Sequence, residues 1–146
     1  MKKLFIAALL VVAVGSSAFA LDVNKISYKA KNNFEAQFSG AENVMWALRE
    51  TYVKASFTLA DQNVDAFFSQ EGDLIAFSRK IELKKLPLNA LQKIKKDYAT
   101  YTVTESIEFD EDGDKSYYVS LEEGPKKHIL QVSLYGSVSV FKGQKK

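Results

Sequence analysis

Apolar residues recur at helical spacing in two separate segments of the chain. The first segment spans residues 30–39 and stops before Gly40, a residue type that commonly ends a helix. The second begins at Pro87, whose missing N–H costs nothing in the first turn of a helix. The apolar positions are Ala30, Phe34 and Phe38 in the first segment, and Leu88, Leu91, Ile94 and Tyr98 in the second. Both segments are therefore predicted to form amphipathic helices.

Elsewhere, apolar and polar residues alternate with a period of two, which predicts strands with one buried face. Four strands are expected after the first helix, around residues 44–48, 52–59, 64–69 and 74–79. Four more are expected after the second helix, around residues 101–109, 117–121, 130–134 and 138–141, and the first of these is long enough to contain a bulge. Short segments containing Gly72, Gly113, Gly124 or Gly136 separate several of these strands and indicate tight turns.

The same order of elements, one helix followed by four strands, occurs twice. We interpret residues 30–80 and 87–141 as two degenerate repeats within a single domain of residues 21–141, followed by a frayed tail at 142–146. The predicted fold is α+β, with one antiparallel sheet and both helices packed on one of its faces. Trp46, the only tryptophan, is in phase with Val44 and Leu48, so we expect its indole to anchor the core beneath the first helix.

The first twenty residues resemble a secretory signal peptide. Lys2 and Lys3 precede an apolar run from Leu4 to Val14, and Ala18-Phe19-Ala20 supplies small residues for cleavage after Ala20. The run is shorter than the ~20 apolar residues that a membrane-spanning helix needs. We therefore expect export to the periplasm or the cell exterior, with no membrane span left in the mature chain.

Composition narrows the classes of function. The chain has 20 Lys plus Arg and 18 Asp plus Glu, and removal of Lys2 and Lys3 leaves the mature chain formally neutral. A neutral chain without a basic stripe is a poor nucleic-acid binder, because that binding depends on neutralising phosphates. No cysteine is present, so the domain relies on its apolar core rather than on disulfides. No cofactor is expected.

Several short motifs occur along this pattern: Phe34 and Phe38 before Gly40-Ala41, Val44 with Trp46, Tyr52 with Ala55 and Phe57, Val64 to Phe68 before Glu71-Gly72-Asp73, Leu86-Pro87, and Tyr98 with Tyr101. Together these motifs resemble the PepSY-like family of small exported bacterial proteins, also described as beta-lactamase-inhibitor-protein-like. The resemblance covers essentially the whole mature chain. It implies no catalytic residues, and it implies kinship in fold with proteins that dock a concave sheet onto an enzyme.

Candidate catalytic residues do not converge on one constellation. His128 is the only histidine, and without cysteine it cannot build a common zinc site. The pairs Glu105–Glu108 and Glu122–Glu123 would serve an acid–base hydrolase only if a cleft held them at a defined separation. We therefore predict that the protein is not an enzyme, and a hydrolase stays as the less favoured alternative.

The acidic segment from Asp110 to Asp114 invites comparison with a calcium loop. An EF-hand loop places glycine at position six and glutamate at position twelve, whereas here glycine is fourth and the twelfth residue is Leu121. A solvated acidic hairpin is the favoured interpretation, and weak calcium binding at residues 110–114 stays open.

The face of the sheet away from the helices is the main candidate surface. Strand alternation places six residues there as a partner-binding set: Tyr52, Lys54, Phe67, Tyr118, Gln131 and Tyr135. Aromatic side chains dominate interface energetics, so the set suits a module that binds another exported protein or a peptide, as an inhibitor or a sensor. Aromatic pairs that only stabilise the sheet would give the same pattern. The alternative function is a small-molecule or peptide carrier with a groove between helices and sheet.

Overall fold

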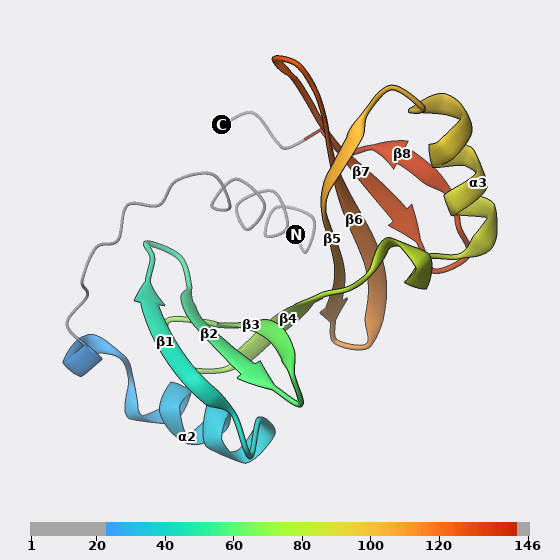
Figure 1. The fold of residues 1–146 in the computed structure, drawn as a ribbon. Helices are drawn as coiled ribbons and strands as arrows, with labels where there is room; N and C mark the ends of the chain where they lie inside the picture. Colours follow the sequence, from blue (N-terminus) through green and yellow to red (C-terminus); the bar gives the residue numbers. More distant parts are fainter. Residues whose placement is uncertain (1–22, 143–146) are drawn as a thin grey trace.

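The computed structural model describes residues 23–142, so the expected signal peptide and most of the expected tail lie outside the described residues. This range contains two α-helices, α2 at Tyr28–Gln37 and α3 at Leu88–Asp97 (Figure 1). A short 3₁₀ turn precedes each helix, at Val23–Lys25 and at Leu83–Lys85. The strands are β1 Glu42–Leu48, β2 Val53–Leu59, β3 Gln62–Phe68, β4 Leu74–Lys80, β5 Thr102–Glu111, β6 Asp114–Glu123, β7 Lys126–Ser133 and β8 Val138–Val140.

The strands form one antiparallel sheet in which neighbours in sequence are also neighbours in space, from β1 at one edge to β8 at the other. The predicted α+β fold with one antiparallel sheet is thus confirmed, and β2 begins one residue after the start of the strand predicted at residues 52–59. β5 and β6 are longer than predicted, because Asp110 belongs to β5 and only Asp112 and Gly113 form the turn. Their φ angles of 52° and 86° suit a two-residue hairpin turn, which needs positive φ at both positions.

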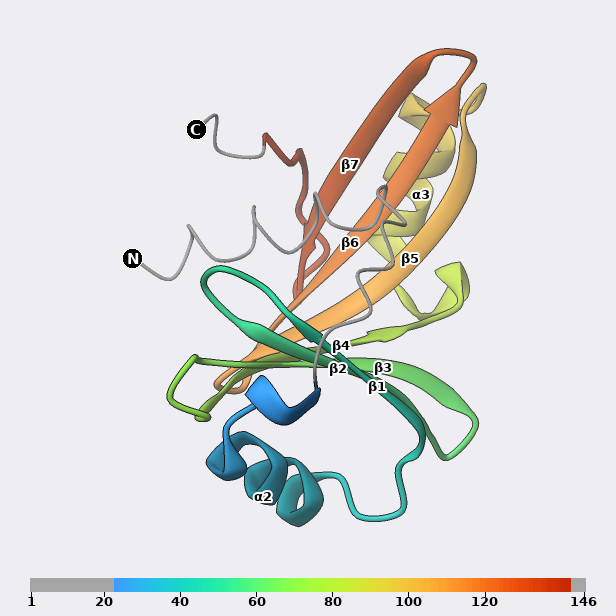
Figure 2. The ribbon, with the colours of Figure 1, turned by 90° about the vertical axis from the view of Figure 1, so that its left-hand side faces the viewer.

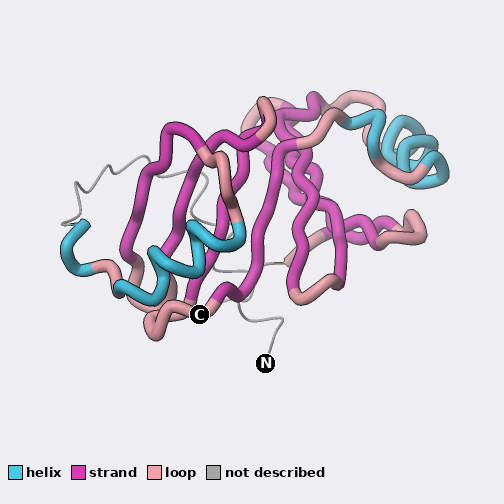
Figure 3. Tube along the Cα trace, turned by 90° about the horizontal axis from the view of Figure 1, so that it is seen from below, coloured by secondary structure: helices cyan, strands magenta, loops and turns pink. Residues whose placement is uncertain are grey.

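The sheet twists and bends between β4 and β5, so its two halves face different directions (Figure 2). α2 packs on β1–β4 and α3 packs on β5–β8, as the view from below also shows (Figure 3). Register partners lie on the same face of a sheet. Phe77 beneath α2 pairs with Asp110, and Glu108, two residues earlier on the same face of β5, pairs with Tyr117 beneath α3. Both helices therefore lie on one face, as predicted, and the other face is the concave side of the bend (Figure 2).

The start of α2 is held by its cap and by the turn between β3 and β4. The Ser27 hydroxyl accepts a hydrogen bond from Ala30 N at 3.1 Å, which satisfies one of the free N–H groups of the first turn. Asn33 Nδ2 donates to the Gly72 carbonyl oxygen at 2.7 Å. Gly72 has a φ of +99°, and a Cβ at this position would lie 2.6 Å from Ala30 N, so the close approach requires glycine.

The β3–β4 and β7–β8 turns share one hydrogen-bond pattern. In the first turn, Ser69 N donates to Asp73 O at 2.8 Å, Gly72 N donates to Ser69 O at 3.0 Å, and Asp73 N donates to Ser69 Oγ at 3.1 Å. The corresponding residues of the second turn are Ser133, Gly136 and Ser137, with distances of 2.9, 2.9 and 3.0 Å. The second turn also receives a hydrogen bond from its helix, because Asn89 Nδ2 donates to Tyr135 O at 3.0 Å.

The core beneath α2 is largely aromatic. Its buried members include Phe34, Phe38, Phe57 and Phe68. The Trp46 indole packs against this core, with its ring centre 5.2 Å from that of Phe34 in an edge-to-face arrangement. The prediction that Trp46 anchors the core beneath the first helix is confirmed, but the side chain is only half-buried because β1 is an edge strand.

The core beneath α3 is mostly aliphatic. Its buried aliphatic members are Leu86, Ala90, Ile94, Val119, Leu121, Leu130 and Val132, with Tyr117 beside them. Within residues 23–142, neither helix has the length and apolarity needed to cross a membrane.

Candidate functional site

Five aromatic rings cross the concave, helix-free face of the sheet as a connected series, which we call the aromatic ladder. Ring centres are 5.8 Å apart for Tyr52 and Phe67, 6.4 Å for Phe67 and Phe109, 6.2 Å for Phe109 and Tyr118, and 5.4 Å for Tyr118 and Phe141. The ladder includes side chains from β3, β5 and β6. It therefore bridges the two halves of the sheet on the side that neither helix covers.

The aromatic ladder belongs to a third apolar cluster, distinct from the cores beneath the helices. Its four rings from Tyr52 to Tyr118 are at most 5% exposed. Half-buried Ile75, Ile107 and Ile129 pack against the cluster. These rings therefore stabilise the sheet, and direct contact with a partner would fall mainly to the less buried side chains around them.

The two tyrosine hydroxyls of the ladder lie in a poorly hydrated environment. Burial raises the pKa of Tyr118 above its ordinary value, and the nearby Ser116 hydroxyl opposes this only in part. No hydrogen bond of good geometry reaches Tyr118 Oη from the part of the chain that the structure describes. Burial also raises the pKa of Tyr52, with the Arg49 cation opposing the shift and the Asp65 carboxylate adding to it.

Five of the six predicted residues lie together on the concave side. Tyr52, Phe67 and Tyr118 belong to the aromatic ladder. Lys54 is the register partner of Phe67 and Gln131 is the register partner of Tyr118, so both flank the ladder, and both are half-buried. The alternation in the sequence thus placed these five side chains on the correct face.

Tyr135 lies apart from the other five. β7 ends at Ser133, so strand alternation no longer applies, and Tyr135 lies in the following turn with 85% of its surface exposed. Its carbonyl oxygen accepts the hydrogen bond from Asn89 at the start of α3, which places the turn beside that helix. The prediction that Tyr135 shares the concave face is therefore wrong.

Two members of the ladder, Phe109 and Phe141, were missing from the predicted set. β5 contains a register shift between Val103 and Glu105, which reverses the alternation counted from Val103 and turns Phe109 to the concave face. Phe141 follows β8 and is held by the hydrogen bond from its N–H to Ile129 O at 2.7 Å. The length of the strand predicted at residues 101–109 allows a bulge, but the sequence specifies neither the position of the shift nor the hydrogen bond that holds Phe141.

A groove of about 350 Å³ opens on the concave face beside the ladder. A polar row runs along its floor, in which Ser56 of β2, Asp65 of β3 and Ser78 of β4 are consecutive register partners. Met45 of β1, which is 69% exposed, and half-buried Ile107 of β5 add apolar walls. The carrier hypothesis placed a groove between helices and sheet, but this groove lies on the opposite face.

Two acidic side chains of the groove differ in their partners. Glu105 forms an ion pair with Lys80, whose Nζ lies 3.5 Å from Glu105 Oε1. Asp65 is half-buried, and within residues 23–142 its carboxylate forms no hydrogen bond or ion pair. The groove therefore contains one negative charge that the described residues leave uncompensated by direct contact.

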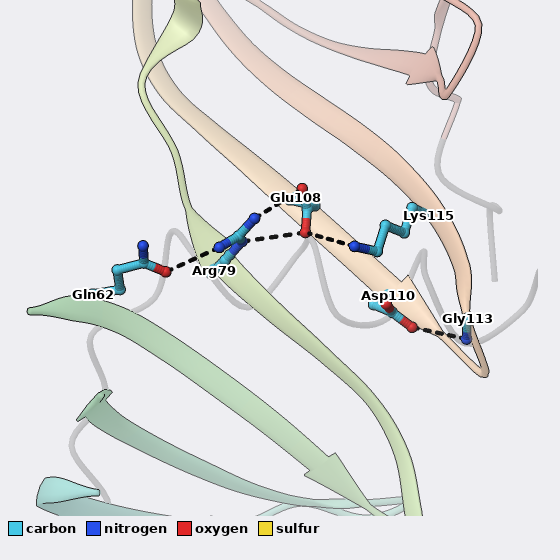
Figure 4. Close-up of polar contacts among 6 residues, drawn as sticks. All are labelled: Gln62, Arg79, Glu108, Asp110, Gly113 and Lys115. Carbon is cyan, nitrogen blue, oxygen red and sulfur yellow. Dashed lines mark hydrogen bonds and ion pairs between the residues drawn. The ribbon is translucent and has the colours of Figure 1, made fainter. Parts of the chain in front are cut away.

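A charged cluster joins β4 to β5 on the helix side of the sheet (Figure 4). Arg79 Nε and Nη2 donate to the two oxygens of Glu108 at 3.2 and 3.3 Å, and Arg79 Nη1 donates to Gln62 Oε1 at 3.1 Å. Lys115 Nζ lies 3.7 Å from Glu108 Oε1, and the Glu108 side chain is only 11% exposed. The forked Arg79–Glu108 contact fixes the two halves to each other and commits Glu108 to a structural role.

The remaining candidates for acid–base chemistry are dispersed. Glu122 pairs with Lys127 at 3.4 Å. His128 is half-buried beside the rings of Tyr98 and Tyr101, whose centres lie 6.5 and 5.5 Å from its own. No carboxylate forms an ion pair with His128 in the described part of the chain. The described residues therefore bring no nucleophile, base and orienting group together.

The acidic turn does not gather calcium ligands. Asp110 is buried, and its Oδ1 accepts a hydrogen bond from Gly113 N at 2.9 Å, so this carboxylate is turned into the hairpin. Among residues 23–142, no group of three or more His, Cys, Asp or Glu side chains is arranged to hold a metal ion.

Comparisons with known proteins identify the fold. No protein-family model matches the sequence, and no curated protein sequence matches it. A BLIP-like protein from Bacteroides fragilis superposes with a TM-score of 0.70 at 16% identity, over 86% of this chain and 89% of that chain. A protein from Bacteroides eggerthii, described as a putative periplasmic protein, has a TM-score of 0.71 at 10% identity, over 77% of this chain and 84% of that chain.

A third solved structure, a DUF2874 family protein from Bacteroides uniformis, has a TM-score of 0.70 at 12% identity, over 77% of this chain and 85% of that chain. The chain therefore has the fold of the BLIP-like proteins, which confirms the resemblance inferred from its sequence at the level of fold. At these identities the likeness carries no residue roles, so function depends on the side chains themselves.

Proposed function

We propose that the protein is an exported binding module that recognises another exported protein or a peptide on the concave face of its sheet. The observation that carries this proposal is the aromatic ladder, which crosses a face that both helices leave uncovered and which adjoins an open groove. Rings locked in a sheet form a rigid platform, and a rigid platform loses little conformational entropy when a partner binds.

The leader sequence and the fold support the export part of this proposal. Residues 1–20 have the charged, apolar and small-residue order of a signal peptide. The structural neighbour from Bacteroides eggerthii is described as a putative periplasmic protein, and the neighbour from Bacteroides fragilis is described as BLIP-like. The binding unit in this proposal is the single domain of residues 21–141.

The burial of the ladder decides how the proposal should be tested. Replacing Tyr52 or Tyr118 with alanine would leave a cavity in a buried cluster and would destabilise the protein, so lost binding would be ambiguous. Lys54 and Gln131 flank the same rings and are half-buried, so their replacement changes the surface with less effect on the cluster. The test variant is therefore Lys54→Glu combined with Gln131→Glu.

The experiment uses the purified protein to capture partners from a periplasmic extract of the producing bacterium. We expect the Lys54→Glu, Gln131→Glu variant to bind the captured protein about tenfold more weakly or worse, since its two new carboxylates would have to lose water against a partner surface that fits Lys54 and Gln131. Amide hydrogen exchange in the complex should slow at the strand segments next to these residues.

The matched control is Lys95→Glu combined with Gln92→Glu, which makes the same two substitutions on exposed positions of α3. We expect this control to bind like the unmodified protein. Equal loss in both variants would show that net charge rather than the concave face is responsible. Undiminished binding by the Lys54→Glu, Gln131→Glu variant would contradict the proposal.

A further inference from the structure

We propose that the groove beside Asp65 receives one arginine side chain from the protein partner. This inference rests on the proposed function and names the chemistry by which the partner is recognised. Three observations carry it: an uncompensated carboxylate, further oxygen acceptors around that carboxylate, and apolar walls above it.

The charge of the groove favours a cation. Lys80 and Glu105 already neutralise each other at 3.5 Å, so Asp65 supplies the remaining charge. Docking a partner over the groove would remove water from a carboxylate that is already half-buried. Desolvating a carboxylate is costly unless an opposite charge and hydrogen bonds replace the water, so an apolar or anionic group would be rejected.

The arrangement of acceptors favours arginine over lysine. Ser56 and Ser78 flank Asp65 on the two neighbouring strands, and Asn43 and Asn63 also line the groove. These side chains offer several oxygens around one point. A guanidinium has five N–H donors in a planar fork and uses spread acceptors well, whereas an ammonium is a compact point charge.

The walls of the groove suit the rest of an arginine side chain. Met45 and Ile107 come from β1 and β5, on opposite sides of the polar floor. Long cationic side chains bury their methylene stems along apolar surface while the charged head meets polar groups. The volume of about 350 Å³ lies at the small end of the usual range for binding pockets, which suits one side chain better than a larger ligand.

Lys54 is a further cation on this face of the sheet. It lies on the same face of β2 as Ser56, but its register partner is Phe67 and no ion pair joins it to Asp65 within residues 23–142. A cation from the partner would therefore not have to displace an existing contact. The Asp65 carboxylate is available in the protein as it stands.

The test is an NMR titration of the purified protein with N-acetyl-L-arginine amide, with N-acetyl-L-citrulline amide as an uncharged probe of nearly the same shape. We expect the arginine probe to shift the amide signals of Ser56, Asp65 and Ser78 in a saturable way. Asp65→Asn should weaken this binding about tenfold or more, because a charged hydrogen-bonded pair is lost. Asp73→Asn is the matched control, since it removes the same charge from the exposed turn after β3.

Three results would overturn the inference: equal binding of the citrulline probe, unchanged binding by Asp65→Asn, or equal binding of N-acetyl-L-lysine amide. Loss of folding is a small concern for Asp65→Asn, because the two side chains have nearly the same shape and the amide spectrum reports the fold directly.

The captured partner separates this inference from the proposed function. If that partner fails to bind the Lys54→Glu, Gln131→Glu variant but binds Asp65→Asn like the unmodified protein, the concave face is the binding site and the arginine inference is wrong. If the Lys54→Glu, Gln131→Glu variant binds normally, the proposed function itself is wrong.

Discussion

The two halves of the molecule build the same arrangement from different side chains. Ala30, Phe34 and Phe38 of the first helical segment correspond to Ala90, Ile94 and Tyr98 of the second, at a constant offset of 60 residues. Both Ala30 and Ala90 are fully buried where helix meets sheet. The first half then completes its core with aromatic rings, whereas the second uses mainly aliphatic residues.

The position of each half in the sheet explains part of this difference. Trp46 of β1 pairs with Ala55 of β2, and Ser106 of β5 pairs with Val119 of β6. Because Ala55 and Val119 are equivalent positions in the two halves, Trp46 and Ser106 are equivalent as well. β1 is an edge strand, so a large ring is needed there to close the side of the core. β5 lies between β4 and β6, and Ser106 is buried without any such ring. An edge must therefore supply lateral cover that an interior strand receives from its neighbours.

The largest expected effect comes from truncating the central helix residue of each half. Phe34 contacts the rings of Phe38, Trp46 and Phe57, with centres 5.6, 5.2 and 5.0 Å away. We expect Phe34→Ala to lower the free energy of unfolding by about 4 kcal/mol, against about 3 kcal/mol for Ile94→Ala. Urea unfolding of both variants measures this. A larger loss of unfolding free energy for Ile94→Ala would contradict the view that the core beneath α2 depends on one residue more than the core beneath α3 does.

The next effect distinguishes the two helix-contacting turns. An alanine Cβ at residue 72 would meet the backbone of Ala30, whereas one at residue 136 would meet only the side chain of Asn89, which can rotate away. We expect Gly72→Ala to cost about 3 kcal/mol and Gly136→Ala about half as much, because both have positive φ but only the first clash is rigid. Thermal unfolding compares them, and equal losses would show that the turns are equally tight.

A smaller effect should be the same in both halves. Ser69 and Ser133 make matching side-chain hydrogen bonds to their turns, at 3.1 and 3.0 Å. Each serine-to-alanine substitution is expected to cost about 1 kcal/mol, the usual net value of such a bond. Ser139→Ala, at an exposed position of β8, is the control and should change stability little. Unequal losses at Ser69 and Ser133 would weaken the correspondence between the turns, which supports an internal duplication.

The smallest effect at neutral pH concerns a position where the halves differ in polarity, Lys54 in the first and Tyr118 in the second. Tyr118→Phe removes a buried hydroxyl without a good partner, so stability at pH 7 should stay within about 1 kcal/mol of the original. Above pH 10 the Tyr118→Phe variant should be more stable than the unmodified protein. Burial raises the pKa of Tyr118 in the folded state, so folding favours the protonated phenol, and its contribution is lost as pH rises through the folded pKa.

Chemical unfolding between pH 7 and pH 11 tests this sign. The loss of stability above pH 10 should be shallower for Tyr118→Phe than for the unmodified protein, with the remaining slope including Tyr52. An identical slope would show that Tyr118 has the same pKa in the folded and unfolded states and would contradict the predicted effect of its burial.

Local patterns in the sequence were sufficient for most of the fold. The alternation from Tyr52 to Leu59 predicted β2 to within one residue, and the residues around Gly72 and Pro87 marked a turn and a helix start. The concave placement of Phe67 and Tyr118 also followed from alternation. These features depend only on residues that are close in the chain, so a single sequence contains the information.

The features that were missed depend on contacts between distant segments. The register shift in β5 turns Phe109 to the concave face, and it is defined only by pairing with β6. Asp65 had no special signal, since a lone aspartate in a strand is ordinary. Its setting arises because β2 and β4 place serines on both sides of it and β1 and β5 add apolar walls. The end of β7 at Ser133, which displaced Tyr135, is likewise set by the turn that packs beside α3.

The consecutive strand order has a consequence for how the chain reaches its native state. Each pairing except that of β4 with β5 joins strands separated by a short turn, and the exception spans only the connection through α3. Such local pairings close small loops, which favours rapid folding. A chain exported N-terminus first would meet its pairing partners in the order in which they emerge. The chain has no cysteine, so no disulfide protects it while it folds. Rapid pairing of the strands therefore limits the time during which unpaired strands are exposed to aggregation and proteolysis.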